Sequence, residues 1–254
     1  MHIDWSGIDH VTKVDPAKPL PPDPSILEAT DLVMIGGSDD VTAENTLETI
    51  EAVREAVPEV PVCQEPYEAD HVTMDTVDTV DFLAIPAVYN GDRDHFVGKH
   101  LAMFAELAAT PSSILGSSIP VVGNVIESKG EAAVAEVAEK IVGEGYVIQH
   151  LDSAAAETAG VTEACSTAEV GGAALATESF YGFPIFYVEY SGTYGGSEDV
   201  AAAASQLEET VLLYGGGIDS QEKAEEILAA GADAIVVGDV FHEDPDGFLE
   251  TVPE

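Results

Sequence analysis

Residues 211–239 read VLLYGGGIDSQEKAEEILAAGADAIVVGD and contain the repeating unit of the fold. A short apolar run ends in three glycines, Ser220 opens a stretch with helical spacing, Gly231 closes it, and a second apolar run ends at Gly238-Asp239. Two buried strands joined by a helix are parallel, because the helix carries the chain back to the end of the sheet where it started. The segment therefore predicts a strand–helix–strand unit of a parallel sheet.

The same alternation runs through the whole chain. Apolar runs that we interpret as strands lie at 8–14, 32–35, 61–64, 82–85, 146–149, 184–189, 211–214 and 234–237. Helical stretches lie at 42–57, 97–107, 131–142, 153–176, 200–207 and 220–231, the first of them capped by Thr42. The polar, β-branched residues 67–80 predict a missing or degenerate helix, and the irregular residues 108–130 predict an elaborated loop.

Eight such units in 254 residues favour a closed barrel over an open doubly wound sheet. The expected fold is therefore an α/β protein with a modified (β/α)8 or TIM barrel. No change in composition marks a linker, so residues 1–254 are expected to form a single domain.

Composition excludes several classes of protein. Hydrophobic residues make up 46% of the chain and the mean hydropathy is +0.11, so disordered and collagen-like chains are excluded. Cys63 and Cys165 lack metal-binding or redox spacing, and we interpret them as incidental thiols. No apolar run reaches the roughly 18 residues of a membrane span, and the first residues lack the regions of a signal peptide. We therefore expect a soluble, cytoplasmic protein.

Charge is the extreme feature of the composition. The chain has 48 acidic residues against 8 lysines and arginines, a formal net charge of −40. Such a field repels nucleic acids and anionic membranes. It is typical of a solvated surface suited to high salt, where the Debye length falls to about 3 Å at 1 M. Pairs of acidic residues carry little information in such a chain, whereas a lysine within an apolar strand is informative.

Two glycine-rich turns follow the last two predicted strands. They are Gly215-Gly216-Gly217 and Gly238-Asp239. In a TIM barrel the loops after strands 7 and 8 commonly bind phosphate through backbone N–H groups. The sequence therefore predicts a phosphate site at these loops; the alternative is that the glycines only make tight turns.

Charged residues end two other predicted strands. Lys13 and Asp15 share one face of the first strand, because side chains alternate along a strand. One hypothesis is that Lys13 binds phosphate while Asp15 helps to hold a divalent cation; the other is an internal ion pair between the two. At the sixth strand, Tyr187 and Glu189 share a face, which makes Glu189 a candidate general base beside an orienting hydroxyl. Otherwise Glu189 is a carboxylate at the rim.

Familiar motifs of other enzyme classes are missing from the sequence. No HExxH or CxxC occurs, and the stretch from Asp39 to Ala43 does not fit the magnesium motif of helical prenyltransferases. No G-x-G-x-x-G follows the first strand, so a dinucleotide-binding fold is not expected.

Six short strings occur in a characteristic order along the chain. They are TKVDP at 12–16, IGGSD at 35–39, IPAVYN at 85–90, FYVEYSG at 186–192, YGGGI at 214–218 and IVVGD at 235–239. Together they resemble the geranylgeranylglyceryl phosphate synthase family, which includes the bacterial heptaprenylglyceryl phosphate synthases. The resemblance spans nearly the whole chain, and the YxEYSG string is its most specific part. Residues 108–130 look like an addition.

The resemblance implies an activity and a set of site residues. In that family sn-glycerol 1-phosphate attacks C1 of a polyprenyl diphosphate to give an ether-linked lipid precursor. It implies Mg²⁺ as cofactor with Asp15 and Ser38 as ligands, and it fits Glu189, Tyr187 and Lys13 as the catalytic residues. The implied contacts to glycerol 1-phosphate are Lys13, Tyr187, Val188, Glu189, Tyr190, Ser191, Gly192, Gly217, Gly238 and Asp239. Asp239 stands where the family commonly has asparagine, so a contact through its backbone is acceptable and one through its carboxylate is repulsive.

Context suggests the prenyl donor. A strongly acidic surface, together with the resemblance to an archaeal-type lipid enzyme, points to an archaeon that accumulates salt. In that context the expected donor is geranylgeranyl diphosphate, and the expected reaction is the first committed step of archaeal membrane lipid synthesis. The alternatives are a longer donor in the same reaction, another phosphate-binding barrel isomerase or lyase, or a catalytically silent binding module. The family resemblance also suggests a homodimer.

Overall fold

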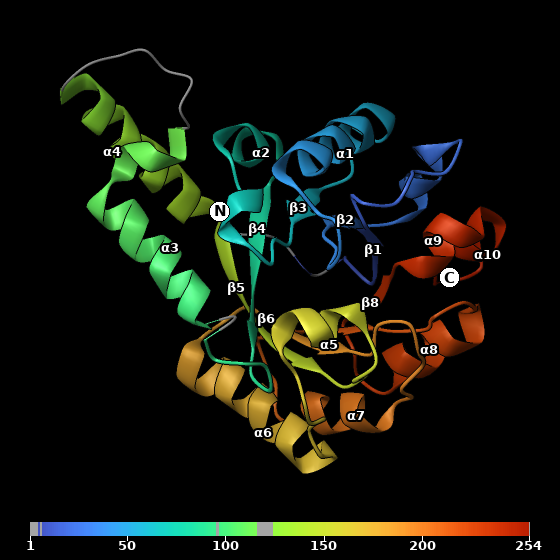
Figure 1. The fold of residues 1–254 in the computed structure, drawn as a ribbon. Coiled ribbons are helices and arrows are strands. Elements are labelled where there is room, and N and C mark those ends of the chain that lie inside the picture. Colours follow the sequence, from blue (N-terminus) through green and yellow to red (C-terminus); the bar gives the residue numbers. More distant parts are fainter. Residues whose placement is uncertain (1–4, 6, 95–96, 116–123, 254) are drawn as a thin grey trace.

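The computed structural model describes residues 5, 7–94, 97–115 and 124–253. Within them eight parallel strands close into a barrel in chain order, with β8 returning to pair with β1, as the sequence predicts (Figure 1). The strands are β1 His10–Val14, β2 Leu32–Ile35, β3 Val62–Gln64, β4 Phe82–Val88, β5 Ile141–Ile148, β6 Ile185–Glu189, β7 Val211–Gly215 and β8 Ala234–Val237.

Helices connect the strands around the outside of the barrel (Figure 1). The α-helices are α1 Ala43–Ala56, α2 Met74–Thr79, α3 Val97–Ala109, α4 Asn124–Lys140, α5 Ala154–Ala159, α6 Thr167–Ala176, α7 Glu198–Ala204, α8 Gln221–Ala229, α9 Asp239–Glu243 and α10 Pro245–Leu249. Shorter helical turns are η1 Pro24–Ala29, η2 Ala69–His71, η3 Pro111–Leu115 and η4 Thr177–Tyr181.

The capping expected for the first long helix is present. Thr42 accepts a hydrogen bond from the backbone N–H of Asn45, and the Asn45 side chain accepts one from the Thr42 N–H. This reciprocal pair satisfies two of the N–H groups that a helix start leaves free. Ser220 occupies the equivalent position before α8 without making a side-chain capping bond.

Buried side chains divide into two layers because the strand residues alternate between two faces. One layer fills the barrel interior with residues such as Leu32, Met34 and Leu213. The other, which includes Phe186 and Val188, packs between the strands and the outer helices. On β6 this alternation turns Tyr187 inward and Phe186 outward, as the sequence predicts. Inward-facing residues near the carboxyl ends of the strands therefore meet at one mouth of the barrel.

The helix after β3 is not missing. Residues 67–80 contain η2 and the six-residue helix α2, which begins with Thr73 and Thr76 in a capping box. Polar and β-branched residues weaken the helical periodicity, so this helix is short and its start depends on side-chain capping.

Two other boundaries differ from the prediction. β4 continues through Pro86 to Val88 instead of ending before the proline. β3 pairs only with Phe82 and Leu83 of β4. Pro86, which has no N–H, therefore loses no hydrogen bond to β3. α4 already begins at Asn124 within the expected loop, while Ile141 and Val142 start β5 instead of ending a helix. Residues 116–123 of that predicted loop lie outside the described residues.

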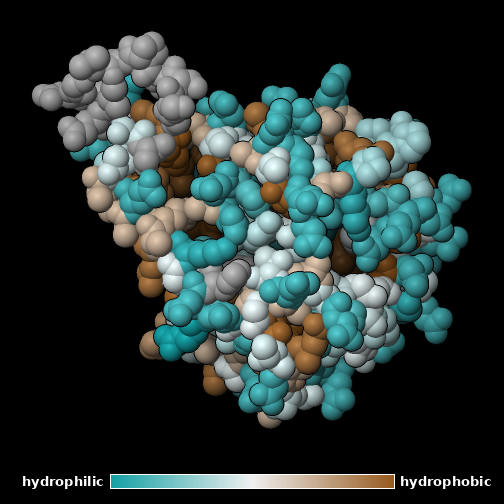
Figure 2. Space-filling view, viewed as in Figure 1, coloured by the Kyte–Doolittle hydropathy of each residue, from teal (hydrophilic) through white to brown (hydrophobic). Residues whose placement is uncertain are grey.

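The surface is mainly hydrophilic on the face shown in Figure 2, and hydrophobic residues gather there along α3. Val97, Leu101 and Phe104 on this helix are exposed. Among the described residues no helix is long and apolar enough to cross a membrane.

Candidate active site

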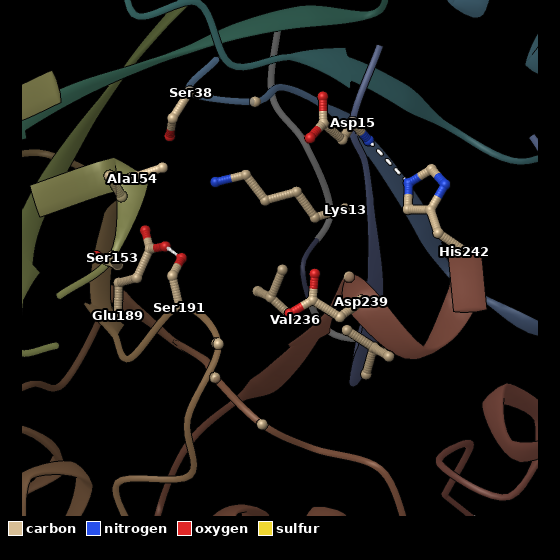
Figure 3. Close-up of a pocket in the computed structure, with 18 of the residues that line it drawn as sticks. Lys13, Asp15, Ser38, Ser153, Ala154, Glu189, Ser191, Val236, Asp239 and His242 are labelled. Carbon is tan, nitrogen blue, oxygen red and sulfur yellow. Dashed lines mark hydrogen bonds between the residues drawn. The ribbon is translucent and has the colours of Figure 1, made fainter. Parts of the chain in front are cut away.

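A cavity of about 850 Å³ opens at the carboxyl ends of the barrel strands. Residues from the ends of β1, β2, β6, β7 and β8 line it, together with the loop after β5. The lining includes these sequence-predicted residues: Lys13, Asp15, Ser38, Tyr187, Glu189, Ser191, Gly192, Gly217, Gly238 and Asp239. Figure 3 shows several of their side chains around the same space, with Lys13 pointing between Ser38 and Glu189.

Lys13 lies in a cage of carboxylates and aromatic rings. Its Nζ is 2.6 Å from Oε2 of Glu65 at the end of β3. The same nitrogen lies 5.6 Å from the ring centre of Tyr187 and 6.0 Å from that of Tyr146. Burial lowers the pKa of Lys13, but the charges of Glu65 and Glu189 outweigh it and raise the pKa well above its ordinary value. Lys13 is therefore a permanent cation, and its ion pair is with Glu65 and not with Asp15.

Glu189 ends β6 and is almost completely buried. Its Oε1 accepts a hydrogen bond from the hydroxyl of Ser191, whereas its Oε2 has no hydrogen-bond partner among the described residues. Burial raises the pKa of Glu189 to about 7, against the opposing effect of Lys13. A carboxylate with a free oxygen and a pKa near neutrality has the properties of a general base.

Tyr187 lies two residues before Glu189 on the same face of β6. Its ring packs against that of Tyr146 at a centroid distance of 4.6 Å. A Cβ at Gly215 on the neighbouring strand would overlap the hydroxyl oxygen of Tyr187. Glycine at this position therefore lets the hydroxyl reach across the end of β7. Burial raises the pKa of this phenol, which stays protonated and able to donate a hydrogen bond.

Asp15 and Ser38 lie on adjacent strand ends. The Asp15 carboxylate packs directly against Gly37, where any side chain would overlap it, and it accepts a hydrogen bond from Ala17 N–H at 2.9 Å. The backbone N–H of Asp15 donates to Nε2 of His242 at 3.1 Å (Figure 3). Because Nδ1 of His242 lies 3.1 Å from the Pro19 carbonyl oxygen, that nitrogen carries the ring proton.

Asp15 and Ser38 are the residues that would hold a magnesium ion, because a carboxylate and a hydroxyl are oxygen donors. Among the described residues no group of three His, Cys, Asp or Glu side chains could hold a metal. Mg²⁺, however, is usually bound by one or two carboxylates together with substrate phosphate oxygens and waters. One carboxylate and one hydroxyl beside an open cavity match that pattern.

Asp239 begins α9 directly after β8 and faces Lys18 from the loop after β1. Lys18 Nζ lies 3.0 Å from Oδ1 of Asp239. Both side chains are about half exposed, so the pair adds little stability. Its effect is on the local charge, because the ammonium group offsets a carboxylate at the rim of the cavity.

Two of the predicted contact residues, Val188 and Tyr190, lie away from the cavity lining. Val188 packs between the barrel and its helices. The hydroxyl of Tyr190 donates to Oδ2 of Asp199 at 2.6 Å, and Gln149 donates to the same oxygen at 2.7 Å. This network anchors the loop that carries Ser191.

Sequence reasoning missed Glu65, Lys18, His242 and the buried Glu144. Glu144 points into the barrel from β5, and neither of its carboxylate oxygens has a hydrogen-bond partner in the described part of the chain. Burial and the charge of Glu65 raise its pKa well above the ordinary value. The rule that strand ends carry the chemistry could have found Glu65, since it follows the third apolar run. Nothing local distinguishes the other three.

Comparison with known proteins places this chain in a family. The chain matches the PcrB family over residues 2–254. It is 33% identical over 255 residues to heptaprenylglyceryl phosphate synthase of Lysinibacillus sphaericus, covering 99% of this chain and 96% of that protein. It is 34% identical over 245 residues to geranylgeranylglyceryl phosphate synthase of Methanocella arvoryzae, covering 95% of this chain and 93% of that protein. The corresponding Haloquadratum walsbyi enzyme is 31% identical over 257 residues, 99% of this chain and 95% of that one.

A solved structure shares the fold. It is (S)-3-O-geranylgeranylglyceryl phosphate synthase from Thermoplasma acidophilum in complex with sn-glycerol-1-phosphate. The TM-score is 0.72 at 20% identity, with 97% of this chain and 93% of that one covered. At this level of identity the likeness establishes the barrel architecture.

Proposed function

The chain belongs to the PcrB family, and on that premise we propose that it joins sn-glycerol 1-phosphate to geranylgeranyl diphosphate through an ether bond. The observation that carries the proposal is one cavity in which Lys13, the glycine loops after β7 and β8, and the free oxygen of Glu189 meet. A cation and backbone N–H groups bind phosphate, and a buried base removes a proton from an alcohol.

Binding of glycerol phosphate follows from charge and backbone geometry. Gly217 lines the cavity, and its φ of +58° and the close backbone of Tyr194 leave no room for a side chain there. Together with Gly238 it can offer N–H groups to a phosphate near the ammonium group of Lys13. In this arrangement the glycerol hydroxyl faces Glu189 and is oriented by the hydroxyl of Tyr187.

The reaction forms one carbon–oxygen bond and breaks another. The hydroxyl oxygen of glycerol phosphate attacks C1 of the prenyl donor, its proton passes to the Glu189 carboxylate, and diphosphate leaves with the electron pair of the C1–O bond. Mg²⁺, when bound at Asp15 and Ser38, would neutralise charge on the departing diphosphate. Lys13 adds a fixed positive charge in a site where few others exist.

A small side cavity suggests where the hydrocarbon chain begins. Its volume is about 40 Å³, and it shares Lys13, Ser38 and Glu189 with the main cavity. Its other walls are mainly apolar or aromatic and include Pro86, Val88, Tyr146 and Ile148. This volume suits the allylic end of a prenyl group, and it does not distinguish geranylgeranyl from longer donors.

The assay that tests the proposal supplies the protein with sn-glycerol 1-phosphate and Mg²⁺ at molar KCl. Prenyl diphosphates of increasing length are offered separately, and the lipid product is identified by mass spectrometry. We expect the ether with the geranylgeranyl donor and loss of activity with EDTA. A preference for a longer donor would reassign the substrate, and no product with any donor would refute prenyl transfer.

The Lys18–Asp239 pair predicts an effect on substrate affinity. Lys18→Ala should expose the Asp239 carboxylate to the phosphate and raise the KM for glycerol 1-phosphate by about five-fold, or about 1 kcal/mol. Asp239→Asn in the same chain should restore the parent KM, since the repulsive charge is removed. Steady-state kinetics of both variants provide the measurement. A double variant no better than Lys18→Ala would show that Lys18 acts on the substrate and not through Asp239.

The net charge of −40 predicts strong dependence of stability on salt. Self-repulsion destabilises the folded chain at low ionic strength and is screened at molar KCl. A gain of about 4 kcal/mol would raise Tm by roughly 10 °C for a chain of this size. Thermal unfolding followed by circular dichroism across a KCl series measures it. An unchanged Tm would contradict a high-salt adaptation and, with it, the archaeal context of the donor.

A homodimer is the assembly we propose. Leu101, Phe104 and Phe180 expose large apolar side chains, which a second copy could cover. Light scattering should then give about twice the 26.5 kDa chain mass, whereas the monomer mass would rule the dimer out.

A further inference from the structure

The ion pair of Lys13 joins two strands that are not neighbours. Lys13 lies on β1 and Glu65 follows β3, with β2 between them. Gly36 occupies the end of β2 where the two side chains meet. A Cβ there would lie 2.7 Å from the Glu65 carbonyl oxygen and 3.1 Å from its Oε2. The absence of a side chain at Gly36 thus lets the Glu65 carboxylate pass over β2 and reach Lys13.

Lys13 has a second carboxylate within its electrostatic reach. Glu189 on β6 is, after Glu65, the next charge that acts on its ammonium group. The ion pair nevertheless forms with Oε2 of Glu65 at 2.6 Å, and Oε2 of Glu189 is left without a partner in the described residues. One carboxylate therefore holds the cation while the other keeps a free oxygen.

We propose that Glu65 is a positioning residue that holds the Lys13 ammonium group toward β3, which leaves the Glu189 carboxylate free to accept the proton of the substrate hydroxyl. The inference rests on the proposed function, because it assigns a role within the same reaction. Glu65 pairs with Lys13 and lies outside the lining of the main cavity, although it does line the small side cavity. Without it, the carboxylate that acts most strongly on the ammonium group is that of Glu189, the proposed base.

The consequence for Glu189 has a definite sign. The titratable and charged groups around it are Lys13 from β1, Glu65 after β3, Glu144 and Tyr146 from β5, Tyr187 from β6 and Asp239 from α9. Glu65→Gln removes a negative charge that raises the pKa of Glu189. It also releases Lys13, whose charge lowers that pKa. Both changes lower the pKa of the base and make it weaker.

The experiment measures kcat and kcat/KM between about pH 5 and 9 for the parent, Glu65→Gln and Glu65→Asp. In the plot of kcat against pH, the fall in activity on the acidic side, called the acid limb, should move down by about one pH unit in Glu65→Gln. The constant kcat reached above that limb should fall about ten-fold. Aspartate keeps the charge but is too short to hold Lys13 past Gly36, so its limb should move by less. The shift of the aspartate variant relative to the parent tests the proposal even if the glutamine variant does not fold.

Glu68→Gln is the matched control. Glu68 lies three residues beyond Glu65 and pairs with Lys99 at 2.5 Å on the surface, so its removal should leave the pH profile unchanged. A lower kcat for both Glu65 variants with an unmoved acid limb would show a structural role and overturn the proposal. An inactive parent would instead refute the proposed function, so the two failures are distinguishable.

Discussion

Lys13→Ala should reduce kcat/KM by about 10³-fold or more, the scale of losing a buried charge-assisted contact to a phosphorylated substrate. Among the described residues that line the cavity, the two lysines are Lys13 and Lys18, and Lys18 is paired with Asp239 at the rim. Removing Lys13 leaves the Glu65 and Glu189 carboxylates without their neighbouring ammonium group as two anionic substrates bind. Steady-state and single-turnover kinetics at molar KCl measure the loss.

Two variants sharpen this prediction. Lys13→Arg should recover little activity, because a planar guanidinium cannot replace a compact ammonium group between the Tyr146 and Tyr187 rings. Lys99→Ala, which removes a surface lysine, should behave as the parent. Because breaking a buried pair costs about 3–5 kcal/mol, Tm is measured for every variant. A folded Lys13→Ala protein with near-parent kcat/KM would show that Lys13 does not bind the substrate phosphate.

Glu189→Gln should lower kcat by about 10²–10⁴-fold while largely preserving the KM for glycerol 1-phosphate. Glutamine keeps the shape of the side chain and its contact with Ser191, but it cannot take up the hydroxyl proton. Turnover as fast as the parent's would show that Glu189 is not the base. Tyr187→Phe should cost less, about the 1 kcal/mol of one hydrogen bond.

The pH dependence of the parent provides a second readout for Glu189. Its pKa is raised to about 7 by burial, so the carboxyl is protonated below neutral pH and cannot act as a base. Activity of the parent should therefore fall as the pH drops through about 7 and level off above it. The residual activity of Glu189→Gln should lack this step. A parent profile that stays flat down to pH 5 would assign the proton to another group.

The sequence predicts the barrel and the gathering of several candidate site residues at one cavity, and both predictions have one physical reason. The alternation of apolar runs with helical stretches is local, and in a parallel barrel it brings all the carboxyl ends of the strands to one mouth. Because Lys13 and Glu189 lie at the carboxyl ends of predicted strands, the sequence alone predicts that they lie near each other. The same argument fails at residues 67–80, where the six-residue helix α2 begins with a capping box, and at Ile141, where pairing with β4 starts β5 without a clear period.

Tertiary structure alone decides which charges meet and which oxygens stay free. The partner of Lys13 is Glu65, two strands away, because Gly36 lets the carboxylate cross β2; the sequence offered the nearer Asp15. The partner of Asp239 is Lys18, and the Asp15 backbone donates to His242, both across more than 200 residues of chain. Periodicity determines which face of a strand a residue occupies, since that is a property of neighbouring residues. Pairing around a closed barrel depends on strand register and on the space left between strand ends, which only the assembled fold defines.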